Sequence, residues 1–337
     1  MLRIHFTVAD AMKVRVVVLG AFAELLESFG KLTGPGDGRL FGRWRARTVA
    51  QARALSPDVR ELARFIVPPT HGMADLFTVV GPTDEYTEAV ERLVASPAEA
   101  LRAELGYAPL IGGPRSGWIA DFADGGRVAR QRMTGALDGY HEVAIAPYWP
   151  RIRAVLENER TTRLGIMARD GLGAMLEGLA PPLLRWSPPV LEMPKYHPSS
   201  LEKNTDIYLE GRGLVVVPSL FAAADPGVFT PWGDGPVQLI YQVPLDAPTA
   251  LRLWRDPGTP DDRAVSTLLG TTRAAALRVV AGGCTTSELA RRLNISPGGA
   301  SQHATVLRES GLIISRRHRN TMRHTITRLG LDLLNSA

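Results

Sequence analysis

The chain has 337 residues, a formal net charge of +5, 45% hydrophobic residues and 22% charged residues. This length is sufficient for two or three domains, and the composition is that of a globular protein rather than a disordered or fibrous one. No apolar run approaches the roughly 20 residues of a membrane span, and polar residues interrupt the N-terminal segment where a signal peptide would be apolar. We therefore expect no membrane partner and a cytoplasmic location. The single cysteine, Cys284, excludes an intrachain disulfide and a metal site made of several thiolates.

Residues 1–180 are expected to form a mainly helical domain. The alternation in Leu2–Phe6 predicts a strand, and a wide apolar stripe predicts a helix over about Ala9–Phe29. Periodicity and capping signals predict further helices at Arg43–Leu55, Asp58–Ile66, Tyr86–Leu93, Pro97–Leu105, Val128–Ile145 and Trp149–Leu179.

Residues 181–255 have a different character. Short β-like runs separated by Gly/Pro turns predict strands at Val190–Met193, Thr205–Leu209, Leu214–Val217 and Val237–Val243. The Gly211-Arg212-Gly213 sequence precedes a strand, whereas a dinucleotide-binding fingerprint follows one, so it indicates a turn. We expect a small antiparallel sheet packed on the helical domain, and then a linker over residues 256–263.

Residues 264–337 have the pattern of a winged helix-turn-helix. Thr285 or Thr286 can cap a first helix, and a second begins with Ser296 as its cap and Pro297 in its first turn. This second helix is expected to end at Gly311, and a basic β-hairpin follows over residues 312–327. The predicted fold class is α+β and mainly helical: an N-terminal α+β domain with a small antiparallel sheet, followed by a C-terminal winged helix-turn-helix.

Charge is unevenly distributed along the chain. Residues 263–337 contain eleven Arg and three acidic residues, or +8, whereas residues 1–262 carry 28 basic and 31 acidic groups, or −3. A basic module on a slightly acidic body is typical of a nucleic-acid-binding protein. The second helix would enter the major groove and the hairpin would contact phosphates or a narrow minor groove. The predicted DNA-binding residues are Ser296, Gly298, Gly299, Ser301, Gln302, His303, Thr305, Arg308, Arg316, Arg317, His318, Arg319, Asn320 and Arg323.

Several of these residues have more than one interpretation. Gln302 is the best candidate for reading a base, because its amide can pair bidentately with adenine. His303 is either a phosphate contact or a half-buried residue that holds the helix in place. Gly298 and Gly299 either allow close approach to the groove or leave the helix loose without DNA. The hairpin arginines can also be a solvated surface, and Cys284 is either a small buried hydrophobic residue or a redox-sensitive thiol.

The segments ELARRL, ISPGGASQH and VLRESGLI, with the Arg-rich wing, resemble the DNA-binding domain of ArsR/SmtB-type bacterial repressors over residues 264–335. The resemblance implies a homodimer, formed by the flanking helices Leu268–Ala281 and Leu329–Leu334, that binds a palindromic operator in double-stranded DNA. Gly299 and Ala304 depart from the family's pattern. Metal-sensing members carry Cys pairs or His/Asp sets that this chain lacks, so we expect no metal and no cofactor.

The N-terminal part of the chain resembles that of actinobacterial ArsR-type regulators with a long N-terminal domain. The segments that carry this resemblance are residues 149–157 and 211–221. It implies a one-component transcription factor and supplies no ligand.

The sequence predicts a sensor rather than an enzyme. The seven histidines are scattered, neither a GxSxG elbow nor a P-loop occurs, and His141-Glu142 is an adjacent pair that points in different directions on a helix. A pocket for a small apolar or aromatic effector could be lined by Trp118, Phe122, Tyr140, Tyr148, Trp149, Trp186, Tyr208 and Phe221, with Tyr196 and Trp232 as further candidates. Each of these side chains can equally be part of the core. The alternative is an N-terminal domain that serves only as a dimerisation or protein-interaction platform, without a small-molecule ligand.

Overall fold

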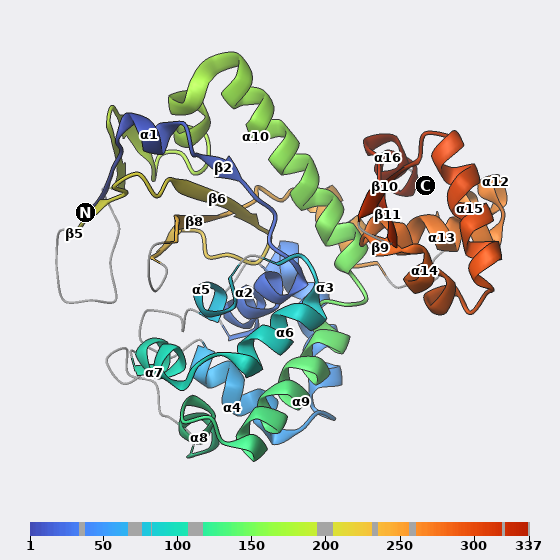
Figure 1. Ribbon diagram of the computed structural model, residues 1–337, viewed down its shortest axis with the longest axis horizontal. Helices are drawn as coiled ribbons and strands as arrows, with labels where there is room; N and C mark the ends of the chain where they lie inside the picture. Colours follow the sequence, from blue (N-terminus) through green and yellow to red (C-terminus); the bar gives the residue numbers. More distant parts are fainter. Residues whose placement is uncertain are drawn as a thin grey trace. The chain divides into compact units, whose positions relative to one another are not determined.

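The computed structural model describes residues 1–33, 38–66, 76–81, 83–106, 117–193, 205–230, 235–255, 261–318 and 321–335. The chain divides into two compact units. Unit 1 comprises Met1–Ala146 and Leu156–Leu245, and unit 2 comprises Pro147–Val155 and Asp246–Ala337. The long helix α10 (Trp149–Glu177) therefore contributes residues to both units (Figure 1). Within the described ranges, no helix is both long enough and apolar enough to cross a bilayer.

The first part of unit 1 is a cluster of helices. They are α1 (Val8–Ala11), α2 (Ala21–Thr33), α3 (Gly38–Ala52), α4 (Pro57–Ile66), α5 (Leu76–Val80), α6 (Tyr86–Ala95), α7 (Ala98–Gly106), α8 (Gly117–Ala123) and α9 (Arg127–Ala144). Helix α9 packs against α2, α3, α4, α6 and α8 (Figure 1). Its Tyr140 stacks on Phe29 with ring centroids 4.1 Å apart, and the indole N–H of Trp44 on α3 donates to the carbonyl oxygen of Ala144 at 2.8 Å. The helices predicted between residues 43 and 179 are confirmed, with shifts at their ends.

The predicted helix over Ala9–Phe29 is wrong. Thr7 and Asp10 form a capping box, but it starts only the four-residue helix α1. A strand, β2 (Arg15–Val16), follows, and α2 begins at Ala21. The Val-rich segment between them favours an extended conformation, because β-branched side chains pack well on a sheet. Gly20 separates this strand from α2, and a Cβ atom there would lie 2.8 Å from the backbone of Asp84.

The β-rich part of unit 1 contains two four-stranded sheets, ordered β3-β4-β1-β5 and β2-β6-β8-β7. Besides β2, the strands are β1 (Leu2–His5), β3 (Arg185–Ser187), β4 (Val190–Met193), β5 (Thr205–Tyr208), β6 (Leu214–Ser219), β7 (Gly227–Phe229) and β8 (Val237–Gln242). Strand β1 is antiparallel to β4 and parallel to β5, while β6 is parallel to both β2 and β8. The buried side chains of both sheets and of the end of α10 form one apolar cluster. The sheets are therefore mixed rather than antiparallel, because β1 and β2 each lie parallel to a later strand and β6 lies parallel to β8.

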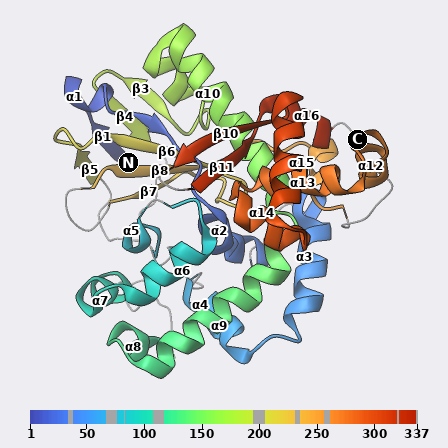
Figure 2. The same ribbon diagram turned by 45° about the vertical axis from the view of Figure 1, so that its right-hand side comes forward.

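Unit 2 is a winged helix-turn-helix preceded by short helices. Its elements, besides the start of α10, are α11 (Ala247–Leu253), α12 (Asp261–Leu269), α13 (Thr271–Ala281), β9 (Cys284–Thr285), α14 (Thr286–Leu293), α15 (Pro297–Glu309), β10 (Ile313–His318), β11 (Thr321–Ile326) and α16 (Arg328–Asn335). Strands β10, β11 and β9 form an antiparallel sheet, and Figure 2 shows β10 and β11 as a paired hairpin. Leu277, Leu289 and Leu307 are fully buried in the common core of these helices. The predicted fold class, an N-terminal α+β domain followed by a C-terminal winged helix, is confirmed.

Candidate nucleic-acid interface

The first helix of the helix-turn-helix, α14, begins and ends where its local sequence predicts. The hydroxyl of Thr285 accepts from the amide of Glu288 at 3.3 Å, and the Glu288 carboxylate accepts from the amide of Thr285 at 2.7 Å. This reciprocal capping box satisfies two amides that a helix start leaves without intrahelical partners. Asn294 ends the helix in the left-handed conformation, with φ at 52°. The left-handed conformation of Asn294 produces the tight turn into the next helix.

The second helix, α15, has one buried face and one open face. The Ser296 hydroxyl caps it by accepting from the amide of Gly299 at 3.1 Å, and Pro297 occupies the first turn. Ala300, Ala304 and Leu307 are buried against the core. The exposed or half-buried residues of the helix start and its open face are Ser296, Gly298, Gly299, Ser301, Gln302, His303, Thr305 and Arg308. The structure thus brings all the predicted DNA-binding residues of this segment onto one element.

The two glycines of α15 differ in their surroundings. A Cβ atom at Gly298 would meet no other atom within 4 Å, whereas at Gly299 it would lie 3.3 Å from the Ser296 hydroxyl oxygen. Among the described residues, packing therefore gives no reason for a glycine at position 298, where glycine weakens the helix.

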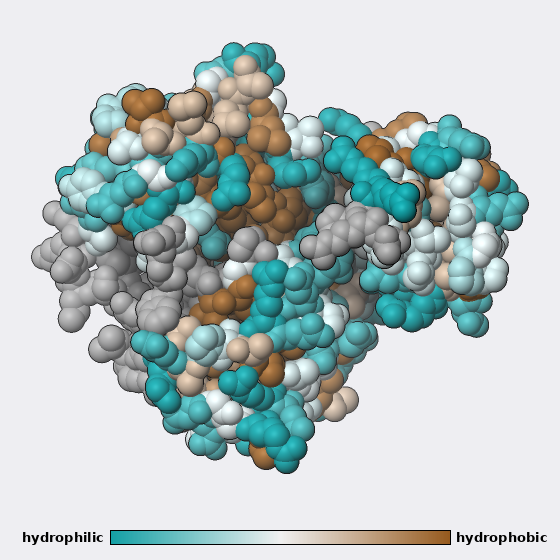
Figure 3. Space-filling model, viewed as in Figure 1, coloured by the Kyte–Doolittle hydropathy of each residue, from teal (hydrophilic) through white to brown (hydrophobic). Residues whose placement is uncertain are grey.

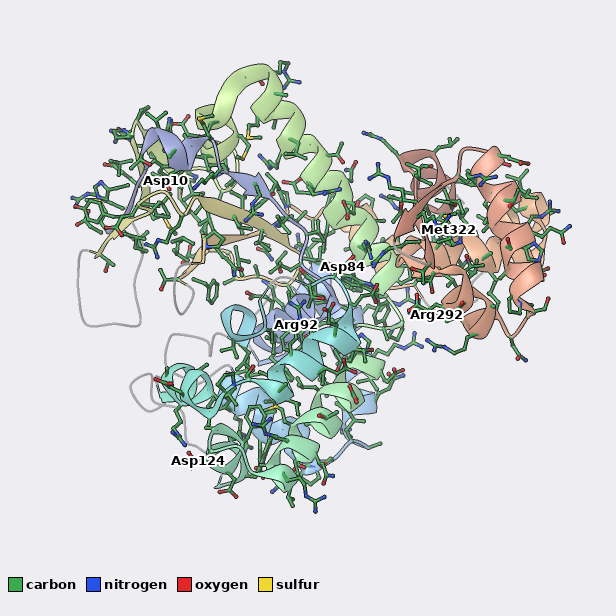
Figure 4. All side chains as sticks on the ribbon, viewed as in Figure 1. Asp10, Asp84, Arg92, Asp124, Arg292 and Met322 are labelled. Carbon is green, nitrogen blue, oxygen red and sulfur yellow. The ribbon has the colours of Figure 1, made fainter. Side chains whose placement is uncertain are left out.

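The wing presents arginines on both of its strands. Arg316 on β10 is opposite Arg323 on β11 in the strand register. Arg316 and Arg317 are exposed and Arg323 is half-buried. The predicted wing-tip residues Arg319 and Asn320 lie outside the described residues, as does the side chain of His318, so their predicted roles stay predictions. Figure 4 labels Met322 on the same strand as Arg323, and Arg292 on α14.

A buried histidine, His324, joins the wing to α14. Its Nε2 lies 2.9 Å from the Thr286 hydroxyl and its Nδ1 lies 2.8 Å from the Ser315 hydroxyl on β10. Burial, with a smaller contribution from the positive charge of Arg308, lowers the pKa of His324 below its usual value. The histidine is therefore neutral at physiological pH and bridges two hydroxyls. The sequence analysis assigned no role to His324. Nevertheless, the alternation of β11 places His324 on the same face as Ile326, which packs on the core.

The predicted ligand-binding aromatics that the structure describes have different packing partners. Tyr140 and Phe221 are buried, and Phe221 packs on Trp44 with ring centroids 4.7 Å apart. Trp118 donates to the Glu61 carboxylate at 2.6 Å. The remaining candidates are buried Phe122 on α8, Tyr148 against Trp254, half-buried Trp149, Trp186 against Phe6, and exposed Tyr208 stacked on His5. Tyr196 and Trp232 lie outside the described residues.

A small recess in unit 1 involves none of these aromatics. It is lined by Leu19, Gly20, Phe22, Ala23, Val80, Gly81, Thr83 and Gln238. Gln238 on β8 is buried, and its side-chain oxygen has no hydrogen-bond partner among the described residues. Sequence reasoning missed this residue, and the available signal was one of the two glutamines, Gln238 and Gln242, inside the otherwise apolar run Val237–Val243.

The described residues bring no three His, Cys, Asp or Glu side chains together as metal ligands. His141, the histidine of the adjacent pair His141-Glu142, stacks on Tyr86 with ring centroids 3.7 Å apart. Burial lowers the pKa of His141 to about 4, although the nearby Asp138 carboxylate opposes this. The ring is thus a neutral packing element at physiological pH.

Comparison with known proteins identifies the C-terminal region. Residues 279–314 match the family of winged helix-turn-helix DNA-binding domains. The match covers the end of α13, the helix-turn-helix and the start of the wing. No curated protein and no solved structure matches the chain. The chain therefore carries a winged helix-turn-helix DNA-binding domain, which is typical of non-enzymatic regulators.

Proposed function

We propose that this protein is a sequence-specific transcriptional regulator, most simply a repressor of the ArsR/SmtB type, acting in the cytoplasm as a homodimer on a palindromic operator. The observation that carries the proposal is the two-sided recognition helix: α15 is anchored by buried Ala300, Ala304 and Leu307, while Gly298, Ser301 and Gln302 are exposed. The helix is followed by exposed arginines on the wing, and residues 263–337 carry a formal charge of +8. Such a surface matches the major-groove and phosphate contacts of winged helices.

Individual roles follow from this arrangement. Gln302 reads a base edge, and Ser301 and Thr305 contact bases or phosphates. Arg316 and Arg317 bind phosphates, which supplies affinity for any sequence and makes binding sensitive to salt.

Dimerisation through the helices that flank the winged helix is supported by their exposed leucines. Leu268 on α12 is 69% exposed and Leu329 on α16 is 58% exposed. A two-fold contact between copies would remove both side chains from water, and two-fold symmetry matches a palindromic operator.

Regulation by a small apolar or aromatic effector is the proposed role of the N-terminal unit. The recess at Gln238 has room for only about one water molecule, so an effector would bind there only if the recess opened, with the unsatisfied amide oxygen of Gln238 as its acceptor. Such a ligand changes DNA affinity only if it binds one dimer geometry more tightly than the other.

The platform role is favoured by a different observation. Tyr140, Phe122 and Phe221 are packed into the core, so their aromatic surface serves stability. A thermal-shift screen of the full chain against small aromatic compounds, with Gln238→Leu beside wild type, separates the two roles. A stabilising compound that loses its effect in the variant supports sensing, and a screen without a specific stabiliser supports the platform.

The experiment that tests DNA binding is a titration of the purified protein onto DNA fragments from upstream of its own gene, repeated at several salt concentrations. We expect a defined complex on one palindromic fragment that weakens as salt rises. Equal, weak binding to every fragment would contradict the sequence-specific role.

A further inference from the structure

The first turns of α10 are held within the DNA-binding unit by two arginines. Arg151 donates to the carbonyl oxygens of Leu253 at 2.9 Å and Arg255 at 2.8 Å, at the end of α11. Arg153 donates to the carbonyl oxygen of Gly282 at 2.5 Å. Each guanidinium is thus placed at the C-terminal end of a helix, where the helix dipole favours a cation.

The carbonyl that Arg153 holds lies at the base of both DNA-contacting elements. Gly282 caps the end of α13, and Gly283 has a φ of 71°, a conformation that favours glycine. The next residue begins β9, in which Cys284 pairs with His324 and Thr285 pairs with Arg323 of the wing. Thr285 is also the cap of α14. The two-glycine turn therefore sets where the wing and the helix-turn-helix begin.

Arg153 and the wing arginine Arg323 face this turn together. A Cβ atom at Gly283 would lie 3.5 Å from Nη1 of Arg153 and 3.6 Å from Nη2 of Arg323. Two cations that share a small space repel each other unless each is held by acceptors. Because the Gly282 carbonyl engages Arg153, the place of that guanidinium limits the positions open to Arg323.

We propose that Arg153 is a positioning residue for DNA binding: it fixes the Gly282-Gly283 turn and so aligns the wing, without contacting DNA itself. The proposal rests on the proposed DNA-binding function and deepens it. Since α10 also contributes residues to unit 1, the hydrogen bond from Arg153 to Gly282 joins the helix shared by both units to the turn that precedes β9.

The first test uses the full-length protein without DNA. Hydrogen exchange is measured for wild type, Arg153→Ala and the control Arg160→Ala, whose arginine lies on the same helix and pairs with Glu157 at its surface. We expect amides of β9 and β11 to exchange about tenfold faster in Arg153→Ala, since a hydrogen bond to a charged group is lost, with no such change in the control. Arg153→Lys keeps a cationic donor and should restore most of the protection. Unchanged exchange in Arg153→Ala would overturn the proposal, whatever the DNA result.

The second test is a double-mutant cycle on the DNA fragment that wild type binds. If Arg153 acts through the wing, Arg316→Ala should cost much less affinity in the Arg153→Ala background than in wild type. The proposal would be overturned if the fold-losses of affinity from Arg153→Ala and Arg316→Ala simply multiplied in the double variant. It would also be overturned if the salt dependence of DNA binding decreased in Arg153→Ala, as it does when a phosphate contact is lost. If wild type binds no fragment specifically, the proposed function fails while the exchange result still decides the positioning role.

Discussion

Replacing Glu24 with glutamine is expected to stabilise the protein at neutral pH and above. Glu24 is buried on α2, and its Oε2 accepts from the backbone amides of Leu220 at 3.0 Å and Phe221 at 3.3 Å. Burial disfavours the charged carboxylate and raises its pKa to about 7, although hydrogen bonds from Ser219, Phe221 and Leu220 act in the opposite direction. The carboxyl therefore gains a proton within the physiological range.

The sign and size of the effect follow from proton linkage. Because the pKa of Glu24 is higher in the folded state than its ordinary value of 4.5, its contribution to stability is complete below pH 4.5. It is lost as the pH rises through about 7. The difference between the two pKa values corresponds to roughly 3 kcal/mol of unfolding free energy. Glutamine keeps the acceptor for both amides and carries no charge, so Glu24→Gln should avoid this loss.

The assay is denaturant unfolding at a series of pH values from 4 to 8, which we compare between wild type and Glu24→Gln. His141 has the opposite dependence: its pKa is lowered to about 4, so its contribution is lost as the pH falls below its ordinary value of 6.5. The two effects partly cancel in wild type, and only the difference between the two proteins isolates Glu24. Glu91→Gln, at an exposed glutamate of α6, is the control. Parallel pH profiles for wild type and Glu24→Gln would refute the reasoning.

Three further outcomes concern the DNA-binding unit. Gln302→Ala should relax base preference at one operator position, which binding to a set of single-base operator variants measures, and unchanged preference would remove Gln302 from base recognition. Arg316→Ala and Arg317→Ala should each weaken binding to all sequences and reduce the slope of log affinity against log salt by about 0.9, whereas an unchanged slope would mean that the wing contacts no phosphate. Gly298→Ala should stabilise the free protein by up to about 1 kcal/mol in thermal unfolding, because the added methyl group meets no protein atom, yet weaken DNA binding, because the methyl group would lie between α15 and the groove. Unchanged DNA affinity in Gly298→Ala would mean that the glycine serves no close approach.

The winged helix could be predicted in detail because its determinants are local. The Thr285 and Glu288 capping box, the Ser296-Pro297 start and the left-handed glycine at Gly311, with φ of 71°, each act within a few residues. The short strand β9 was missed, because two residues carry no periodic pattern and become a strand only by pairing with β11.

The N-terminal unit could not be predicted in the same detail, because its decisive contacts are between residues far apart in the sequence. The parallel pairs of β1 with β5 and of β2 with β6 join strands about 200 positions apart, and no local pattern distinguishes them from antiparallel hairpins. Which polar groups are buried was equally hard to predict, because their burial also depends on contacts with residues far away in the sequence. Glu24 lies among the buried residues Phe22, Leu25 and Leu26, so apolar neighbours on both sides of it along α2 were a signal for its burial.

Helix α10 shows why the boundary between the two units could not be predicted from periodicity. Its first residues pack Ile152 into one core, and its last residues bury Met175 and Leu176 in the cluster shared with the sheets. Between them the buried Arg163 donates to Glu159 at 2.6 Å and to the Gly178 carbonyl at 2.7 Å, and Gly171 interrupts the helix with φ of 90°. A helix that serves two cores has no single apolar stripe, so a sequence pattern assigns it to one domain by default. Figure 3 shows a contiguous apolar area in the upper centre of this face, where Figure 1 places part of α10 and the strands beside it, bordered by hydrophilic surface. The residues that commit it to unit 2, Arg151 and Arg153, are cations that bind backbone carbonyls, and backbone acceptors leave no trace in a sequence.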